Sequence, residues 1–199
     1  AGTSMVKDIN PGTSGSNPMQ ITGSLNQIYF IAEDPSNGQE LWKSDGTTSG
    51  TTLVKNIGAG SANGSVYNIT DVNGTLFFSA SDGVSGAELW KSDGTSSGTI
   101  MIKDINPGST GSYPSTLTNW NGTLFFVADD GVTGDEWWKS DGTPSGTVLV
   151  KDINAGSGGS SLYSFIISGD HFFFPAYEPT TGYELWKSDG TTAGTVLVS

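Results

Sequence analysis

Hydrophobic and polar positions follow one pattern that recurs every 48 residues along the chain. Each copy contains four short segments that favour strands, which in the second copy are residues 66–72, 75–80, 88–91 and 99–105. Phenylalanine and β-branched residues are frequent in them, glycine-containing turns separate them, and no stretch shows a helical period. The pattern therefore predicts an all-β chain with four strands in each copy.

The first two segments of each copy are joined by a two-residue turn. In the second copy this turn is Asn73-Gly74, the dipeptide favoured in a type I′ hairpin because both of its residues need a positive φ. The other copies place different dipeptides at the same position, namely Leu25-Asn26, Asn121-Gly122 and Gly169-Asp170. The hairpin is therefore expected in every copy although its residues vary.

Adjacent aromatic residues in one strand require that both faces of these sheets be buried. Phe77 and Phe78 point to opposite faces of one strand, as do Phe125 and Phe126, so both faces of the sheet need cover. Sheets stacked face to face around an axis supply that cover, and four short strands in 48 residues match the spacing of propeller blades. We expect a β-propeller of four blades. A part of a larger propeller and a β-solenoid array are the alternatives.

The repeat also predicts the organisation of the chain. We expect a single repeat domain over residues 1–199, with units at about 10–57, 58–105, 106–153 and 154–199. Residues 2–9 match the fourth strand of a blade, so the chain has a surplus copy of this strand. An unpaired strand invites pairing with another chain. The chain is therefore expected to be a piece of a longer array or a subunit that joins its neighbours through a terminal strand.

The most constant part of the unit contains a glutamate, a tryptophan and an aspartate. The tryptophan can supply a large buried ring, the aspartate can accept N–H groups of its own turn, and a buried glutamate would need a lysine or backbone donors. We expect a structural role for these columns, which hold Glu40, Trp42, Asp45, Glu88, Trp90, Asp93, Glu136, Trp138, Asp141, Glu184, Trp186 and Asp189. A carbohydrate platform formed by the tryptophan column is the alternative.

These columns belong to an eight-residue string that resembles a known repeat. The string Glu-Leu-Trp-Lys-Ser-Asp-Gly-Thr occurs at 40–47, 88–95 and 184–191, and at 136–143 with Trp137 in place of leucine. It resembles the bacterial ELWxxDGT repeat family, whose members are predicted surface or secreted proteins with propeller-like arrays. The resemblance covers nearly the whole chain. It implies an extracellular or cell-surface location, and it implies no chemistry.

Charge excludes one class of partner. The chain has 20 acidic residues against eight cations, a net charge of −12, and every cation is a lysine in one of two repeat columns. An acidic chain without clustered cations repels a phosphate backbone, so no nucleic-acid partner is expected. No run approaches the roughly 18–20 apolar residues of a membrane helix, so no membrane span is expected either.

No residue set in the sequence indicates catalysis. The chain has one histidine, His171, whose repeat column elsewhere holds glutamine or threonine, and it has neither cysteine nor arginine. A glycosidase needs only two suitably spaced carboxylates, but nothing in the sequence selects such a pair. We therefore expect that the chain is not an enzyme.

Variable residues supply the candidate binding sites. Aromatic residues that could stack on sugars at the loops or at the central mouth of the propeller are Tyr67, Tyr113, Trp120, Tyr163 and Tyr183. A glycine-containing loop carries Asp129, Asp130 and Asp135, whose oxygen atoms suit Ca²⁺, although a solvated acidic loop is the alternative. No other cofactor is expected.

Two functions remain open from the sequence. The first is a non-catalytic extracellular or cell-surface binding and adhesion module that recognises glycans or another surface ligand. The second is a structural surface or filament protein that self-associates through its terminal β-strands.

Overall fold

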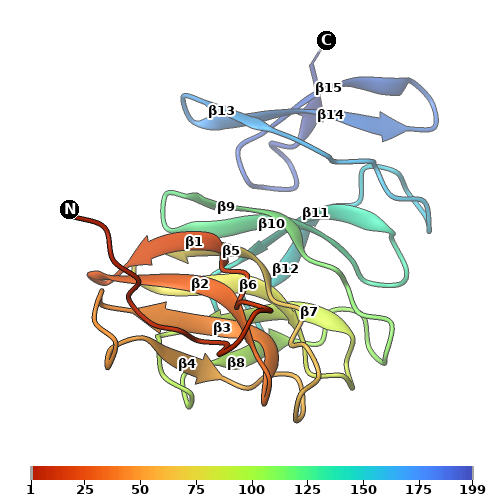
Figure 1. The fold of residues 1–199 in the computed structure, drawn as a ribbon. Coiled ribbons are helices and arrows are strands. Elements are labelled where there is room, and N and C mark those ends of the chain that lie inside the picture. Colours follow the sequence, from red (N-terminus) through yellow and green to blue (C-terminus); the bar gives the residue numbers. More distant parts are fainter. Residues whose placement is uncertain (1, 199) are drawn as a thin grey trace.

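A computed structural model describes residues 2–198 of the chain, which form strands, turns and loops and contain no helix. The strands fall into four antiparallel sheets of four, and in each sheet the strands lie in sequence order (Figure 1). The all-β class and the four-stranded units predicted from the repeat are confirmed. The four sheets form an open row of blades rather than a closed ring.

Blades 1 to 3 have closely similar strand boundaries, and blade 4 has a shorter first and last strand. Blade 1 contains β1 (Met19–Ser24), β2 (Gln27–Asp34), β3 (Gly38–Ser44) and β4 (Thr52–Lys55), and blade 2 contains β5 (Tyr67–Val72), β6 (Thr75–Ser81), β7 (Ala87–Ser92) and β8 (Ile100–Lys103). Blade 3 contains β9 (Ser115–Trp120), β10 (Thr123–Asp129), β11 (Asp135–Ser140) and β12 (Val148–Lys151), and blade 4 contains β13 (Ile166–Ser168), β14 (His171–Glu178), β15 (Gly182–Ser188) and β16 (Val196–Leu197).

The hairpin that joins the first two strands has the predicted backbone. Asn73 and Gly74 have φ of 53° and 86°, and Asn121 and Gly122 have φ of 52° and 81°. Leu25-Asn26 also has a positive φ at both residues, whereas in blade 4 only Gly169 does. Positive φ at both central residues gives the turn the twist of the strands that it joins.

The hydrophobic core lies between neighbouring blades. One cluster joins Tyr29 and Leu41 of blade 1 to Phe78 and Trp90 of blade 2, and two further clusters join blade 2 to blade 3 and blade 3 to blade 4. Phe77 packs toward blade 3, whereas Phe78 packs toward blade 1. Each interior sheet is therefore covered on both faces, as the paired aromatics require.

Three members of the tryptophan column are part of these interfaces, whereas Trp42 packs with Phe30, Ile9 and Leu53. Trp42, Trp90, Trp138 and Trp186 are between 5% and 7% exposed. A lysine of the preceding blade lies over the ring in three of them, with Lys55 at 5.9 Å from the centre of the Trp90 ring. These rings have no free face for a sugar, so the carbohydrate platform formed by this column is wrong.

Residues 2–9, which precede blade 1, lie against it in the way that β4 lies against blade 2. Residues 2–9 were expected to form a surplus strand, but they are not assigned as one because no neighbouring strand forms a ladder with them. Lys7 nevertheless donates from Nζ to the Thr51 carbonyl oxygen at 2.6 Å, as Lys55 donates to Thr99 at 2.7 Å. This segment therefore contacts blade 1 as β4 contacts blade 2.

Replacing a tryptophan of the repeat column should destabilise the fold strongly. Trp90→Ala removes a buried ring and should lower the free energy of unfolding by about 3–5 kcal/mol, measured by denaturant unfolding. Tyr163→Ala is the control, because the Tyr163 side chain is 76% exposed and its loss should change stability by less than about 0.5 kcal/mol. Equal effects of the two variants would contradict a core role for the column.

Candidate binding site

A buried glutamate in each of blades 1 to 3 binds the crossover that leads to the next blade. Glu88 is fully buried and accepts the backbone N–H of Ile105 at 3.0 Å and that of Ser112 at 2.9 Å. Glu136 accepts the N–H groups of Ile153 and Asn154, each at 3.1 Å. Backbone N–H groups together with the Ser112 and Ser160 hydroxyls, and not lysines, therefore satisfy Glu88 and Glu136.

Burial changes the proton affinity of this column. Desolvation raises the pKa of Glu40 and Glu136 to about 7, and hydrogen bonds from the crossover only partly offset it. The pKa of Glu88 is also raised by burial. Glu40 accepts the Gly58 N–H at 2.8 Å, but its Oε2 has no partner because Gly64 stands where the later crossovers have Ser112 and Ser160.

The Lys-Ser-Asp-Gly turn forms a second contact between blades. Asp93 accepts the backbone N–H of Thr95 at 2.8 Å and its hydroxyl at 2.7 Å, and these bonds lower the pKa of the aspartate. Lys91 donates to the Gly142 carbonyl oxygen in the corresponding turn of blade 3, at 2.8 Å. The lysine columns thus join neighbouring blades.

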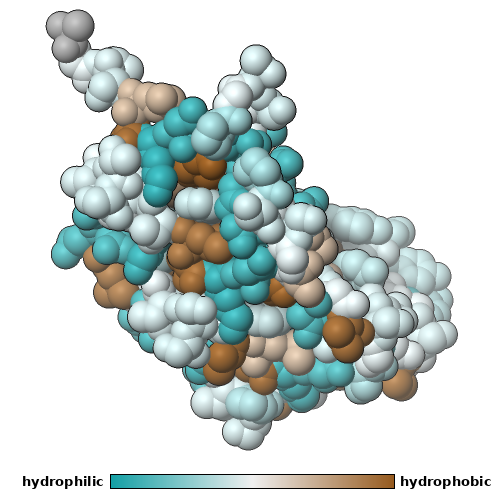
Figure 2. All heavy atoms as spheres, turned by 60° about the horizontal axis from the view of Figure 1, so that its bottom comes forward, coloured by the Kyte–Doolittle hydropathy of each residue, from teal (hydrophilic) through white to brown (hydrophobic). Residues whose placement is uncertain are grey.

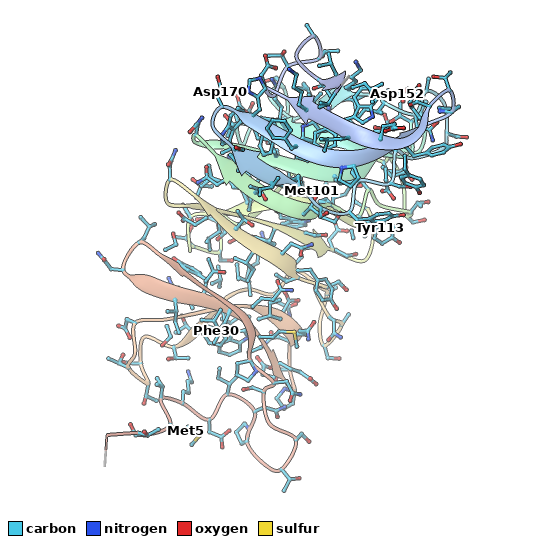
Figure 3. The ribbon with its side chains drawn as sticks, turned by 90° about the horizontal axis from the view of Figure 1, so that it is seen from above. Met5, Phe30, Met101, Tyr113, Asp152 and Asp170 are labelled. Atoms are coloured by element: carbon cyan, nitrogen blue, oxygen red, sulfur yellow. The ribbon has the colours of Figure 1, made fainter. Side chains whose placement is uncertain are left out.

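Two glycines bring the crossover after blade 2 close to β7. A Cβ atom on Gly86 would lie 2.4 Å from the Gly111 nitrogen, and Gly111 forms a bridge with Ala87. The Tyr113 N–H then donates to the Ala87 carbonyl oxygen at 3.0 Å, with a φ of 47° at Tyr113. This close approach fixes Tyr113 at the edge of the row of blades (Figure 3).

The crossover and the adjoining strands of blades 2 and 3 enclose an open pocket of about 530 Å³. Tyr67 and Tyr113 line it and are 46% and 63% exposed. The other lining residues carry no charge, and they are Ser65, Asn68, Ser79, Ser81, Gly86, Ala87, Ser109, Pro114 and Ser115. The structure thus combines two of the predicted aromatic residues with a set of hydroxyl groups.

The other predicted aromatic residues lie elsewhere. Trp120 packs between blades 3 and 4, with its ring centre 4.7 Å from that of Phe172, so its assignment as a ligand-stacking residue is replaced by a role in packing. Tyr163 is exposed on the crossover to blade 4. Tyr183 is exposed on β15, beside Tyr177.

The lining serines were not predicted from the sequence. Repeat comparison offers one signal, because Tyr113 occupies the column of Ser65 and Ser161 whereas Ser115 occupies the column of Tyr67 and Tyr163. Tyrosine therefore alternates with serine at two columns of the crossover. Their convergence on one pocket depends on the packing of blade 2 against blade 3.

The acidic loop of blade 3 is held mainly by its own hydrogen bonds. Asp130 accepts the N–H groups of Val132 and Thr133 at 2.9 and 2.7 Å, while Asp129 accepts that of Gly131. Asp135 pairs with Asp129 across β10 and β11, and its pKa is raised by burial and then by the Asp129 charge. Within residues 2–198, no three acidic, histidine or cysteine side chains converge to hold a metal ion. Calcium binding stays a prediction.

No protein-family model and no curated protein sequence matches this chain. Among solved structures, puromycin hydrolase matches with a TM-score of 0.58 and 19% identity over 92% of this chain and 29% of its own. An acylaminoacyl peptidase of Pyrococcus horikoshii matches with a TM-score of 0.56 and 12% identity over 90% of this chain and 27% of its own. An endo-1,4-β-xylanase of Bacteroides thetaiotaomicron matches at 0.41, with 13% identity over 92% and 72%.

The likenesses to the hydrolase and the peptidase establish the fold alone. Propeller domains are among the matched structures, which confirms the propeller-like arrangement of blades. The chain spans less than a third of the length of the first two proteins, which are enzymes. At such low identity their activities do not extend to this chain, and a non-catalytic role stays a prediction. Residues 2–198 include no helix that is long and apolar enough to cross a membrane.

The buried glutamates predict a decline of stability with rising pH. An acid whose pKa is raised in the folded state binds its proton more tightly there, so ionisation destabilises the fold. The free energy of unfolding should fall as the pH rises from 4.5 through 7, by on the order of 1–3 kcal/mol after allowance for solvent screening.

Denaturant unfolding across this pH range measures the slope. Glu136→Gln removes one titrating group and should reduce the slope, whereas Glu33→Gln, at an exposed glutamate of blade 1, should leave it unchanged. A stability that stays constant or increases over this range would contradict burial of the ionised carboxylates.

Proposed function

We propose that this chain is a non-catalytic binding module and that the pocket between blades 2 and 3 binds a neutral carbohydrate. The observation that supports it is the composition of the pocket. Tyr67 and Tyr113 present exposed rings, serine hydroxyls surround them, and no lining residue is charged although the chain carries a net charge of −12.

The chemistry of sugars suits these groups. A pyranose ring has an apolar face that packs on an aromatic ring and a rim of hydroxyls that exchange hydrogen bonds with serine and with backbone groups. A volume of about 530 Å³ lies within the usual range of small-ligand sites and fits a short oligosaccharide. A neutral pocket in an acidic protein also disfavours anionic ligands, which the surrounding field would repel.

The location proposed for the protein follows from the repeated string. The string at 40–47 and its copies resembles the ELWxxDGT repeats of predicted secreted and surface proteins. We propose on this ground that the chain lies outside the cell or at the cell surface. Adhesion to a glycan-bearing surface is the role that this location and the pocket support together.

Replacing either pocket tyrosine should weaken glycan recognition. A glycan array run with the intact chain identifies a ligand, whose affinity is then measured by calorimetry. Tyr67→Ala and Tyr113→Ala should each weaken binding about tenfold, a loss of about 1.4 kcal/mol. Both side chains are partly exposed, so neither change should unfold the protein.

Tyr163→Ala provides a matched control for this experiment. Tyr163 occupies the same repeat column as Tyr67 and is more exposed, but it does not line the pocket. The control should bind as the parent does. A ligand whose affinity is unchanged by Tyr67→Ala and Tyr113→Ala, or no binding to any neutral glycan, would contradict the proposed function.

A further inference from the structure

The outer face of blade 4 exposes residues that are buried in every other blade. Leu185 is 48% exposed, whereas its counterparts Leu41, Leu89 and Trp137 are fully buried against the following blade. Glu184 is likewise exposed, although the other three glutamates of its column are fully buried. Blade 4 therefore presents one half of a joint between blades.

The outer face of blade 1 presents the other half. Ile21 and Ile28 are 64% and 42% exposed, whereas their counterparts Ile69 and Leu76 in blade 2 are 9% and 1% exposed. They line an apolar groove of about 170 Å³ together with Ile9, Pro18 and Phe30. Figure 2 shows apolar side chains in separate patches between polar ones on the face of the molecule that it views.

The turn glycine of blade 1 lacks the aromatic side chain that covers the turn glycines of the other blades. At the internal joints an aromatic side chain of one blade covers the turn glycine of the next, as Tyr29 covers Gly94 and Phe125 covers Gly190. The corresponding glycine of blade 1, Gly46, has nothing within 4 Å of its Cβ position. Phe173 of blade 4 occupies the column of Tyr29 and Phe125 and is only partly buried.

We propose that these two faces bind each other, so that copies of this chain associate head to tail through a fourth copy of the internal joint. Figure 3 shows the labels Met5 and Asp170 at opposite ends of the row of blades, so the two faces point away from each other within one chain. Because the two faces complement each other, the proposed occupant of each face is a second copy of this chain. An interface of this kind, between different surfaces, produces rings or open chains.

The donors that Glu184 needs are already arranged on blade 1. At the joint between blades 3 and 4 the glutamate accepts from Ile153 and Asn154, whose counterparts at the start of the chain are Ile9 and Asn10. Asn10 donates from Nδ2 to the Gly15 carbonyl oxygen at 2.8 Å, as Asn154 does to Gly159 at 3.0 Å. The segment before blade 1 thus has, in the single chain, the hydrogen bond that the crossover between blades 3 and 4 has when it binds Glu136.

The lysine contact has a counterpart as well. Lys43, Lys91 and Lys139 each donate to the carbonyl oxygen of the turn glycine in the next blade, at 2.8 to 3.0 Å. In the proposed joint, Lys187 of one copy donates in the same way to the Gly46 carbonyl oxygen of the next. In the proposed joint the charged side chains of one copy therefore meet hydrogen-bonding groups of the next, and apolar side chains meet apolar side chains.

The joint requires an exchange of the fourth strand of blade 4. β16 pairs with β15 through two residue pairs, Trp186 with Leu197 and Lys187 with Val196, and the Val198 N–H donates to the Leu185 carbonyl oxygen at 2.9 Å. Residues 3–7 of the second copy occupy the equivalent position beside their own blade 1, held there by Lys7. When the faces meet, this segment replaces β16, and Met5, which is 77% exposed in the free chain, takes the place of Leu197.

Variants blocked at one end test the proposal. Light scattering and analytical ultracentrifugation of the intact chain should show masses above the 20.6 kDa monomer that increase with concentration. Glu184→Lys with Leu185→Asp blocks the blade 4 face, and Ile21→Asp with Ile28→Asp blocks the blade 1 face. All four side chains are exposed, so each variant should stay folded, as checked by circular dichroism, and each should be monomeric.

Mixing the two blocked variants gives the decisive result. Each retains one free face, so an equimolar mixture should form a one-to-one dimer and nothing larger. Asp170→Lys is the matched control, because this blade 4 carboxylate is 91% exposed and lies outside the joint, so the variant should associate as the parent does. A parent that stays monomeric at millimolar concentration, or a mixture that forms no dimer, would overturn the proposal.

Removal of residues 196–199 tests the strand exchange. Because this truncation deletes the competing β16, it should increase association of the otherwise intact chain, whereas unchanged or weaker association would overturn the exchange.

Discussion

Burial of one carboxylate against the backbone of the next blade is the constraint on which the row of blades depends. A desolvated carboxylate is costly unless hydrogen bonds satisfy it, and at Glu88 the crossover supplies N–H groups from three residues together with the Ser112 hydroxyl. These bonds fix where the crossover begins the next blade. Lys91 and Phe77 then reach the following turn from positions that the carboxylate has already set.

The same joint, repeated, makes the molecule nearly one-dimensional. Each blade contacts its neighbours, so stability is expected to be approximately a sum of blade and joint contributions. The residues of the repeat columns form the contacts between blades, so the positions that vary between repeats are the candidates for a functional role. Tyr113 is such a position, because it replaces a serine of the column and projects from a crossover whose path is fixed by Gly86 and Gly111.

Local structure was predictable from the sequence where one repeat decides it. The Asn73-Gly74 hairpin and the two-faced Phe77 and Phe78 strand need only their own blade and its neighbour. The open row and the packing of Trp120 were not predictable, because they depend on the angle between blades and on Phe172, a residue 52 positions away. The pocket was predictable in part. Its tyrosines vary between repeats and could be selected from the sequence, whereas its serines come together only when two blades pack.

Amide hydrogen exchange of the crossovers tests the central role of the buried glutamates most directly. In the intact chain the N–H groups of Ile105, Asn106 and Ser112 should exchange as slowly as those of the β6 and β7 ladder. In Glu88→Ala these three amides should exchange much faster, while those of Ile153 and Asn154 at the next joint stay protected. Crossover amides that exchange as fast as exposed loops in the intact chain would contradict the account.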